Sequence, residues 1–110
     1  MQGVTGDKYI KKVLTSKKKL RQTGLTVGYS NLDLTTQNYL IIISKKVFKK
    51  ANKRNKLRRR IKAILYTNRE VLFATYNSLL VQVTGKELLF INYSDLEAMI
   101  LDSFYKLTHK

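Results

Sequence analysis

The residues SKKVFKKANKRNKLRR, positions 44–59, decide the architecture of this chain. They follow a β-branched apolar run at 38–44, which predicts a strand buried on both faces. The pattern then takes a helical period, which predicts a helix over 47–67. Its apolar face is predicted to comprise Leu57, Ile61, Ile64 and Leu65. Lys53 and Arg54 fall on the same side, so the first turns of the helix are expected to project beyond the core.

The positive charge of the chain is concentrated in this helix and the residues before it. Eleven basic residues and no acidic residue lie between Lys45 and Lys62, and the formal net charge is +15 at pH 7. Such a charge opposes compaction and indicates a polyanionic partner, nucleic acid first and an anionic membrane surface second. A solvated helix face is the plainer interpretation, but solvated faces mix charges of both signs. A membrane-surface helix would need a free apolar face, whereas Leu57, Ile61 and Ile64 are needed for the core.

The remaining pattern predicts a single α+β domain over residues 7–110, in which helices pack on a sheet in two layers. Its order is α-β-β-α-β-α, with residues 1–6 expected to be flexible and left outside the fold. The other predicted elements are a helix at 7–20, strands at 25–29 and 78–84, and a last helix that starts after Tyr93. Ser94 and Glu97 have the spacing of a capping box at the start of that helix.

The residues that usually carry protein-based catalysis are scarce or scattered. The chain has no cysteine, which excludes disulfides and thiolate chemistry, and its single histidine is His109. The seven carboxylates form no pair at acid–base spacing, and no glycine-rich loop opens a helix. No apolar stretch is long enough for a membrane span, and the N-terminus does not resemble a signal peptide. We therefore expect a cytoplasmic binding protein without an active site of its own.

The segment after the predicted central strand resembles the signature of the bacterial ribonuclease P protein component. The matching residues are Ser44-Lys45-Lys46 and then Arg54-Asn55-Lys56-Leu57-Arg58-Arg59, which corresponds to the RNR motif of that family. The resemblance extends over roughly residues 7–107. The chain departs from the family pattern at four places: Phe48 for a glycine, Lys56 for the second arginine of the motif, Lys62-Ala63 for Arg-Glu, and Val13 for an aromatic residue.

This resemblance implies a fold and a role. The fold would be a central sheet flanked by helices with a left-handed β-α-β crossover, an exception to the usual right-handed rule. The protein would be a subunit of an endoribonuclease, ribonuclease P, which removes the 5′ leader of precursor tRNA. Its partners would be the catalytic RNA and precursor tRNA, with no obligatory protein partner and no membrane. The catalytic groups and the Mg²⁺ cofactor would belong mainly to the RNA.

The resemblance also implies two binding surfaces. The catalytic RNA would dock on the basic helix and the residues before it, through Lys45, Lys46, Lys49, Lys53, Arg54, Asn55, Lys56, Arg58, Arg59 and Lys62. The single-stranded leader would lie in a cleft between the first helix and the sheet, lined by Tyr9, Lys12, Val13, Tyr29 and Lys86. The tyrosines would stack on unpaired bases there. Ordinary core packing is the alternative for each tyrosine.

A structural RNA-binding protein, such as a small ribosomal protein, is the alternative from a different functional class. It would account equally well for the charge and the single domain. It would not account for the ordered spacing between Ser44-Lys45-Lys46 and Arg54-Asn55. Stimulation of precursor-tRNA cleavage by a bacterial ribonuclease P RNA at low Mg²⁺ would separate the two.

Overall fold

A computed structural model describes residues 1–15, 18–22, 24–32 and 36–109 of the chain. Five strands form one mixed sheet in the order β1-β4-β5-β3-β2. The strands are β1 (Gln2–Gly3), β2 (Lys19–Gln22), β3 (Leu25–Ser30), β4 (Asn38–Ile43) and β5 (Ser78–Val83). β5 runs parallel to β4 and antiparallel to β3, so the last strand in sequence lies at the centre of the sheet.

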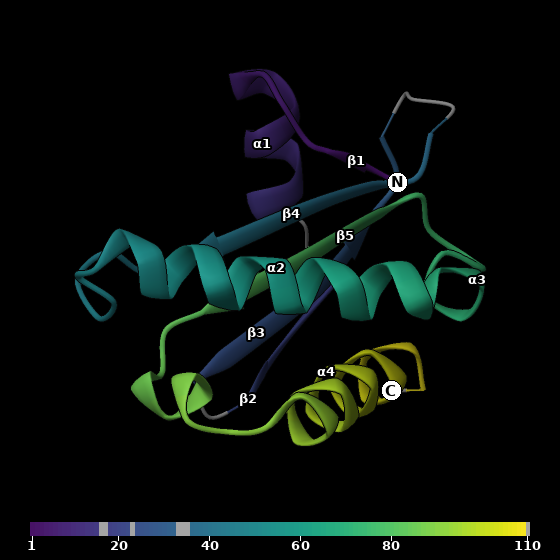
Figure 1. The fold of residues 1–110 in the computed structure, drawn as a ribbon. Helices are drawn as coiled ribbons and strands as arrows, with labels where there is room; N and C mark the ends of the chain where they lie inside the picture. Colours follow the sequence, from purple (N-terminus) through teal and green to yellow (C-terminus); the bar gives the residue numbers. More distant parts are fainter. Residues whose placement is uncertain (16–17, 23, 33–35, 110) are drawn as a thin grey trace.

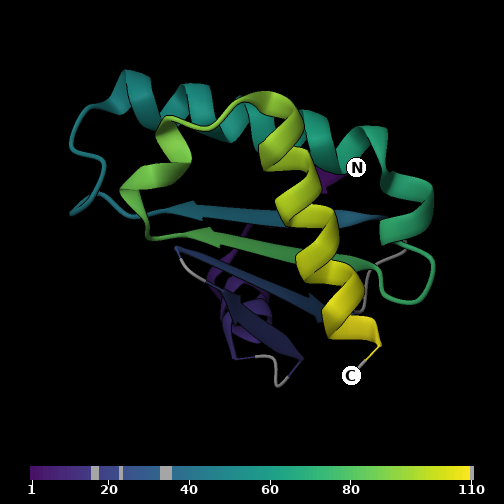
Figure 2. The ribbon, with the colours of Figure 1, turned by 90° about the horizontal axis from the view of Figure 1, so that it is seen from below.

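The helices cover the two faces of the sheet unequally, as Figures 1 and 2 show. One face carries only α1 (Asp7–Leu14). The other face carries the two long helices, α2 (Ala51–Thr67) and α4 (Tyr93–Thr108), with the short α3 (Arg69–Leu72) and the 3₁₀ helix η1 (Lys86–Leu89) beside them. The expected α+β class is confirmed, with helices on both sheet faces rather than on one.

Alternation along the strands divides the apolar residues between these two faces. Val81 of β5 lies between Val27 and Ile41 in register, and all three are buried beneath α2 and α4. The next residue, Leu80, points to the other face and packs with Val13 of α1. Successive side chains of a strand face opposite ways, so the central strand supplies both cores. Figure 2 shows the sheet edge-on between the two helical layers.

The connection from β4 through α2 to β5 crosses over in the left-handed sense. Both strands point the same way, and α2 lies in front of them in Figure 1. When the strands are turned to point upward, β5 lies to the left of β4. This handedness, expected from the resemblance, is rare for parallel strands. The basic segment begins in the turn that connects the end of β4 at Ile43 to the start of α2 at Ala51.

The predicted helix at 7–20 is wrong in its second half. α1 ends at Leu14, and Lys19–Gln22 form strand β2, which pairs antiparallel with β3. Gly24 has φ 74° in the turn between these strands, a conformation that side chains other than glycine rarely adopt. The pairing gives hydrogen-bond partners to the backbone N–H and C=O groups on the outer edge of β3. This stabilisation from tertiary structure outweighs the local helical pattern.

The first residues of the chain and the start of α4 (Tyr93–Thr108) also differ from expectation. Residues 1–6 do not all lie outside the fold, because Gln2 and Gly3 pair with β4 and Val4 is buried. The cap of α4 is Asn92, whose Oδ1 accepts a hydrogen bond from the Asp95 N–H at 2.8 Å. The predicted capping box at Ser94 is therefore wrong by two positions. An Asn side chain directly before the first turn satisfies the same orphan donor as Ser does.

The central segment shows two smaller differences. β4 is not buried on both faces, since Ile41 and Ile43 are buried but Leu40 and Ile42 are half-buried. α2 starts at Ala51, not at 47, because Phe48 turns into the core with only 2% of its surface exposed. Leu57, Ile61, Ile64 and Leu65 are all buried, as the helical pattern predicts. Among the described residues, no helix combines the length and apolar character needed to cross a membrane.

Candidate nucleic-acid interface

The basic segment forms one continuous exposed surface. Nine of the ten residues expected to dock RNA are exposed, on the turn after β4 and on the outward face of α2. They are Lys45, Lys46, Lys49, Lys53, Asn55, Lys56, Arg58, Arg59 and Lys62. We call these nine residues the α2 surface. Among the described residues, none of its cations is paired with a carboxylate, and the ion pair that is present joins Lys106 to Asp102.

Arg54 is the exception, because its side chain is half-buried. Its guanidinium Nη1 donates to the carbonyl oxygen of Phe48 at 2.6 Å and to that of Lys49 at 3.0 Å. These bonds hold the turn that leads from β4 into α2. Hydrogen bonds from a charged donor are stronger than neutral ones. Arg54 therefore positions the loop lysines, a role that its place in the motif did not reveal.

Weaker contacts orient other members of the α2 surface. Arg58 Nη1 donates to Asn55 Oδ1 at 3.3 Å, one turn earlier on the helix. The ammonium nitrogen of Lys62 lies 5.9 Å from the centre of the Tyr39 ring, which comes from β4. A cation at this distance is attracted to the face of the ring. Both contacts leave donors free for phosphate oxygens, since guanidinium has five N–H groups and ammonium has three.

The structure brings three of the five predicted cleft residues together on α1. Val13 is 1% exposed and packs with Val4, Leu32 and Leu80, so it belongs to the core beneath α1. Tyr9 is half-buried at the edge of this cluster, and the ammonium nitrogens of Lys8 and Lys12 each lie 6.0 Å from its ring centre. The half-buried Leu40 and Ile42 of β4 pack against the same cluster. This partly exposed apolar strip, flanked by lysines, we call the α1 strip.

Tyr29 does not join the α1 strip, so its predicted place in the cleft is wrong, whereas the place of Lys86 there stays a prediction. Tyr29 points to the opposite sheet face, where its ring stacks on Tyr76 at 4.9 Å and lies 5.0 Å from the Phe104 ring of α4. Burial, with a smaller contribution from Tyr76, raises the pKa of Tyr29 to about 12. Lys86 opens η1, whose Leu88 packs into the core on that same face. The sequence contained a signal for the position of Tyr29: it alternates with Leu25 and Val27, and alternate residues of a strand face the same side of the sheet.

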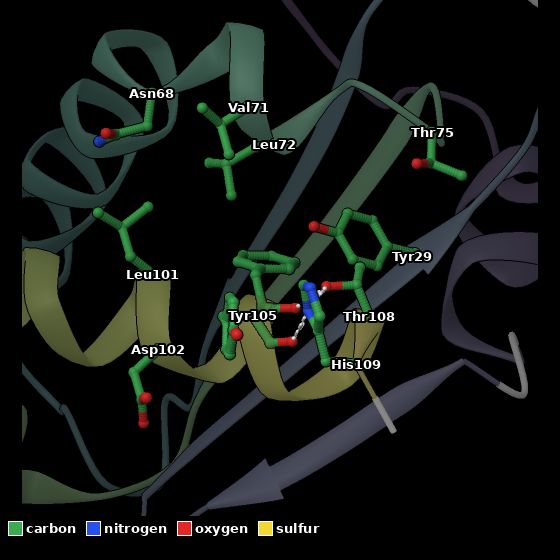
Figure 3. A pocket seen from close by; sticks show the side chains of 11 residues that line it. Tyr29, Asn68, Val71, Leu72, Thr75, Leu101, Asp102, Tyr105, Thr108 and His109 are labelled. Carbon is green, nitrogen blue, oxygen red and sulfur yellow. Dashed lines mark hydrogen bonds between the residues drawn. The ribbon is translucent and has the colours of Figure 1, made fainter.

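Tyr29 lines a large hollow of the described chain, shown in Figure 3. This hollow of about 700 Å³ lies beyond the C-terminal end of α2, between α3 and the last turns of α4. We call it the aromatic hollow. Its walls include Leu72 and the rings of Tyr29, Phe104 and Tyr105, and Tyr105 stacks on His109 with ring centres 4.0 Å apart. Among the described residues, neither lysine nor arginine lines it, whereas the carboxylate residue Asp102 does.

The arrangement of sheet and helices is that of known RNase P proteins. The chain is similar to the structure of Staphylococcus aureus RNase P protein, with a TM-score of 0.76 and 12% identity over 94% of this chain and 92% of that one. It is similar to the RNase P protein from Thermotoga maritima, with a TM-score of 0.70 and 19% identity over 84% and 86% of the two chains. None of the curated proteins matches this sequence. The fold thus defines a small, basic α+β protein of the RNase P protein class.

The family assignment comes from the sequence. A model of the ribonuclease P family matches residues 3–108, which is almost the whole chain, and the chain belongs to that family. It is the protein subunit of the ribonuclease that processes tRNA, and its family works with a ribonuclease P RNA and a tRNA substrate.

Proposed function

We propose that the α2 surface docks this chain on the ribonuclease P RNA. The observation that carries the proposal is the run of eleven basic residues without an acidic one, located on the turn after β4 and on a helix whose other side is buried. Because Leu57, Ile61 and Ile64 are fully packed, the cations are held on a rigid frame. An arginine guanidinium can donate two hydrogen bonds to the oxygens of one phosphate, and each lysine adds a compact positive charge. A rigid array of this kind favours a folded RNA backbone.

The 5′ leader of precursor tRNA then lies along the α1 strip, on the opposite sheet face. Tyr9 provides a ring for unpaired bases, and Lys8 and Lys12 provide charge for the backbone. Val13 supports the strip from within the core. Stacking on a ring accepts any base, which suits a protein that meets leaders of many sequences. The two surfaces would let the protein contact catalytic RNA and substrate at the same time.

The cleavage chemistry is assigned to the RNA partner and its Mg²⁺ ions. Among the described residues, no group of three His, Asp or Glu side chains is close enough to hold a metal ion. The side chains described do not fit a protein-held Mg²⁺ site. In this proposal the protein contributes binding and orientation.

The proposal is tested by reconstitution. The chain is mixed with a bacterial ribonuclease P RNA, and 5′ leader removal from a precursor tRNA is measured at low Mg²⁺. We expect the protein to raise the cleavage rate, and Arg59→Ala to need more protein for the same rate. Arg21→Ala on β2 is the charge-matched control, because Arg21 is exposed and lies outside the α2 surface. No stimulation, or equal loss in both variants, would contradict the docking role of α2.

A further inference from the structure

A second, smaller hollow lies between the first half of α2 and η1. It has a volume of about 150 Å³. Its lining residues are Lys53, Lys56, Leu57, Arg60, Leu89 and Phe90. We call it the cationic hollow. Pockets for drug-sized ligands usually measure about 300–1,000 Å³, so this one suits a smaller group. About five water volumes of roughly 30 Å³ each would fill it, which is the scale of a hydrated phosphate.

Phe90 is the most unusual residue of this hollow. Its side chain is 84% exposed, the largest exposure among the exposed large apolar residues of the described chain. Leu57 beneath it is 1% exposed, so the hollow has an apolar floor that belongs to the core. Among the described residues, no ring or cation covers the Phe90 ring. An open aromatic face beside a cationic hollow is the combination that proteins use for single-stranded nucleic acid.

The charge of the hollow has a single sign. Lys53, Lys56 and Arg60 bring three cations to its walls, and no carboxylate of the described part of the chain lines it. The acidic residue nearest in sequence, Glu87, is turned away, since its carboxylate lies over the backbone of Gly24 and Gly85. Positive charge without a compensating acid attracts an anion and selects against a basic surface on the partner. The missing counter-charge therefore has to come from outside the chain.

We propose that the cationic hollow binds one unpaired nucleotide of the RNA partner. The base stacks on Phe90, and the phosphate on its 5′ or 3′ side enters among Lys53, Lys56 and Arg60. This inference rests on the proposed docking of α2 on RNA and adds to it an anchor for an unstacked base. Arg60, which the RNA-binding set expected from the sequence does not contain, becomes a phosphate ligand here. An acidic protein segment would match the charge but would gain nothing specific from an aromatic ring.

The test measures the Kd of the wild type and six variants for a bacterial ribonuclease P RNA over a series of salt concentrations. Phe90→Ala should weaken binding about five-fold, the lower end of what one stacked base supplies. Phe90→Trp should preserve binding and Phe90→Leu should not, because only the former keeps a ring. Val71→Ala is the matched control, since Val71 is 77% exposed on α3 and lies far from the hollow. Arg60→Gln should make the log–log salt slope shallower by about 0.7.

The outcomes separate this inference from the proposed function. If Arg59→Ala weakens binding but Phe90→Ala binds like Val71→Ala, the nucleotide site is overturned and docking through α2 stands. If Phe90→Leu binds as tightly as wild type, the contact is apolar and the stacked base is ruled out. If Arg59→Ala has no effect either, the proposed function falls as well. Melting temperatures are measured in parallel, and if Phe90→Ala unfolds early, the Trp and Leu variants decide the question.

Discussion

The two hollows beside α2 differ in size and in charge. The cationic hollow, at the first half of the helix, is small and lined by Lys53, Lys56 and Arg60. The aromatic hollow, beyond the C-terminal end, has more than four times the volume, and its lining combines rings and aliphatic groups with polar side chains such as Asp102. Leu57, on the buried face of α2, lines only the cationic hollow of the two. Figure 1 shows the helix running across the sheet between the two regions.

The difference teaches that size alone does not mark the place where a polyanion binds. A phosphate is bound most strongly by cations, and among the described residues the aromatic hollow has neither lysine nor arginine in its lining but does have Asp102. The aromatic hollow instead exposes the edges of the ring cluster around Tyr29, which packs α4 on the sheet. We therefore expect changes there to alter stability, and changes around the cationic hollow to alter RNA binding.

The largest effect is expected from the buried face of α2, which lies between the regions of the two hollows. Ile61 is 0% exposed at the centre of the main core. Ile61→Ala should lower the free energy of unfolding by about 2–5 kcal/mol, because it removes buried methyl groups and leaves a cavity. Urea unfolding measures the change. The neighbouring exposed variant Lys62→Ala should stay within about 0.5 kcal/mol of wild type. Equal losses in the two variants would mean that the faces of α2 are assigned wrongly.

The next largest effect is the pH dependence of stability that comes from Tyr29, which lines the aromatic hollow. The folded state raises the pKa of Tyr29 to about 12 from 10.0. The unfolded chain therefore loses this proton first as pH rises, so the stabilisation is complete below pH 10 and disappears between pH 10 and 12. Two pKa units correspond to about 2.7 kcal/mol. The Tyr29→Phe variant should not show this part of the decrease in unfolding free energy at alkaline pH. Urea unfolding from pH 9 upward measures the decrease. Parallel stability profiles for the two proteins would refute the burial of this hydroxyl.

A smaller effect separates two arginines of the same motif. Arg54→Ala should cost about 1.5 kcal/mol of stability, because it removes the charged hydrogen bonds to Phe48 and Lys49. Arg59→Ala should leave stability within about 0.5 kcal/mol. In RNA binding, six phosphate contacts would give a log–log salt slope near −4, and Arg59→Ala should make it shallower by about 0.7. Thermal melts and salt titrations supply both numbers. A slope near zero for wild type would exclude the phosphate mechanism.

The smallest effect concerns the α1 strip, which neither hollow reaches. Tyr9→Ala should weaken binding of precursor tRNA to the reconstituted enzyme by about 1 kcal/mol, the lower end for one stacked base. Binding of mature tRNA, which lacks the leader, should be unchanged. Tyr66→Ala on α2 is the control, because Tyr66 is an exposed tyrosine that lies outside the α1 strip. A loss that is equal for precursor and mature tRNA would remove Tyr9 from leader binding.

Much of this protein could be predicted from local patterns. Strands at 25–30, 38–43 and 78–83 stand out because apolar runs with β-branched residues suit a buried sheet. The buried side of α2 follows from a period of 3.6 residues, and the structure places Leu57, Ile61, Ile64 and Leu65 there. The ordered spacing of Ser44, Lys45 and Arg54 indicated the family, which the match over residues 3–108 confirms.

The sequence by itself determined the class of fold, the family and the basic face of α2, because these depend on residues close together in the chain. Only the tertiary structure decided which sheet face Tyr29 joins and that Lys19–Gln22 pair with β3. It also brought Phe90 to Arg60, thirty positions earlier, to make the cationic hollow. The physical reason is that strand pairing and side-chain contact between distant segments are set by the whole core, whose packing overrides local preference.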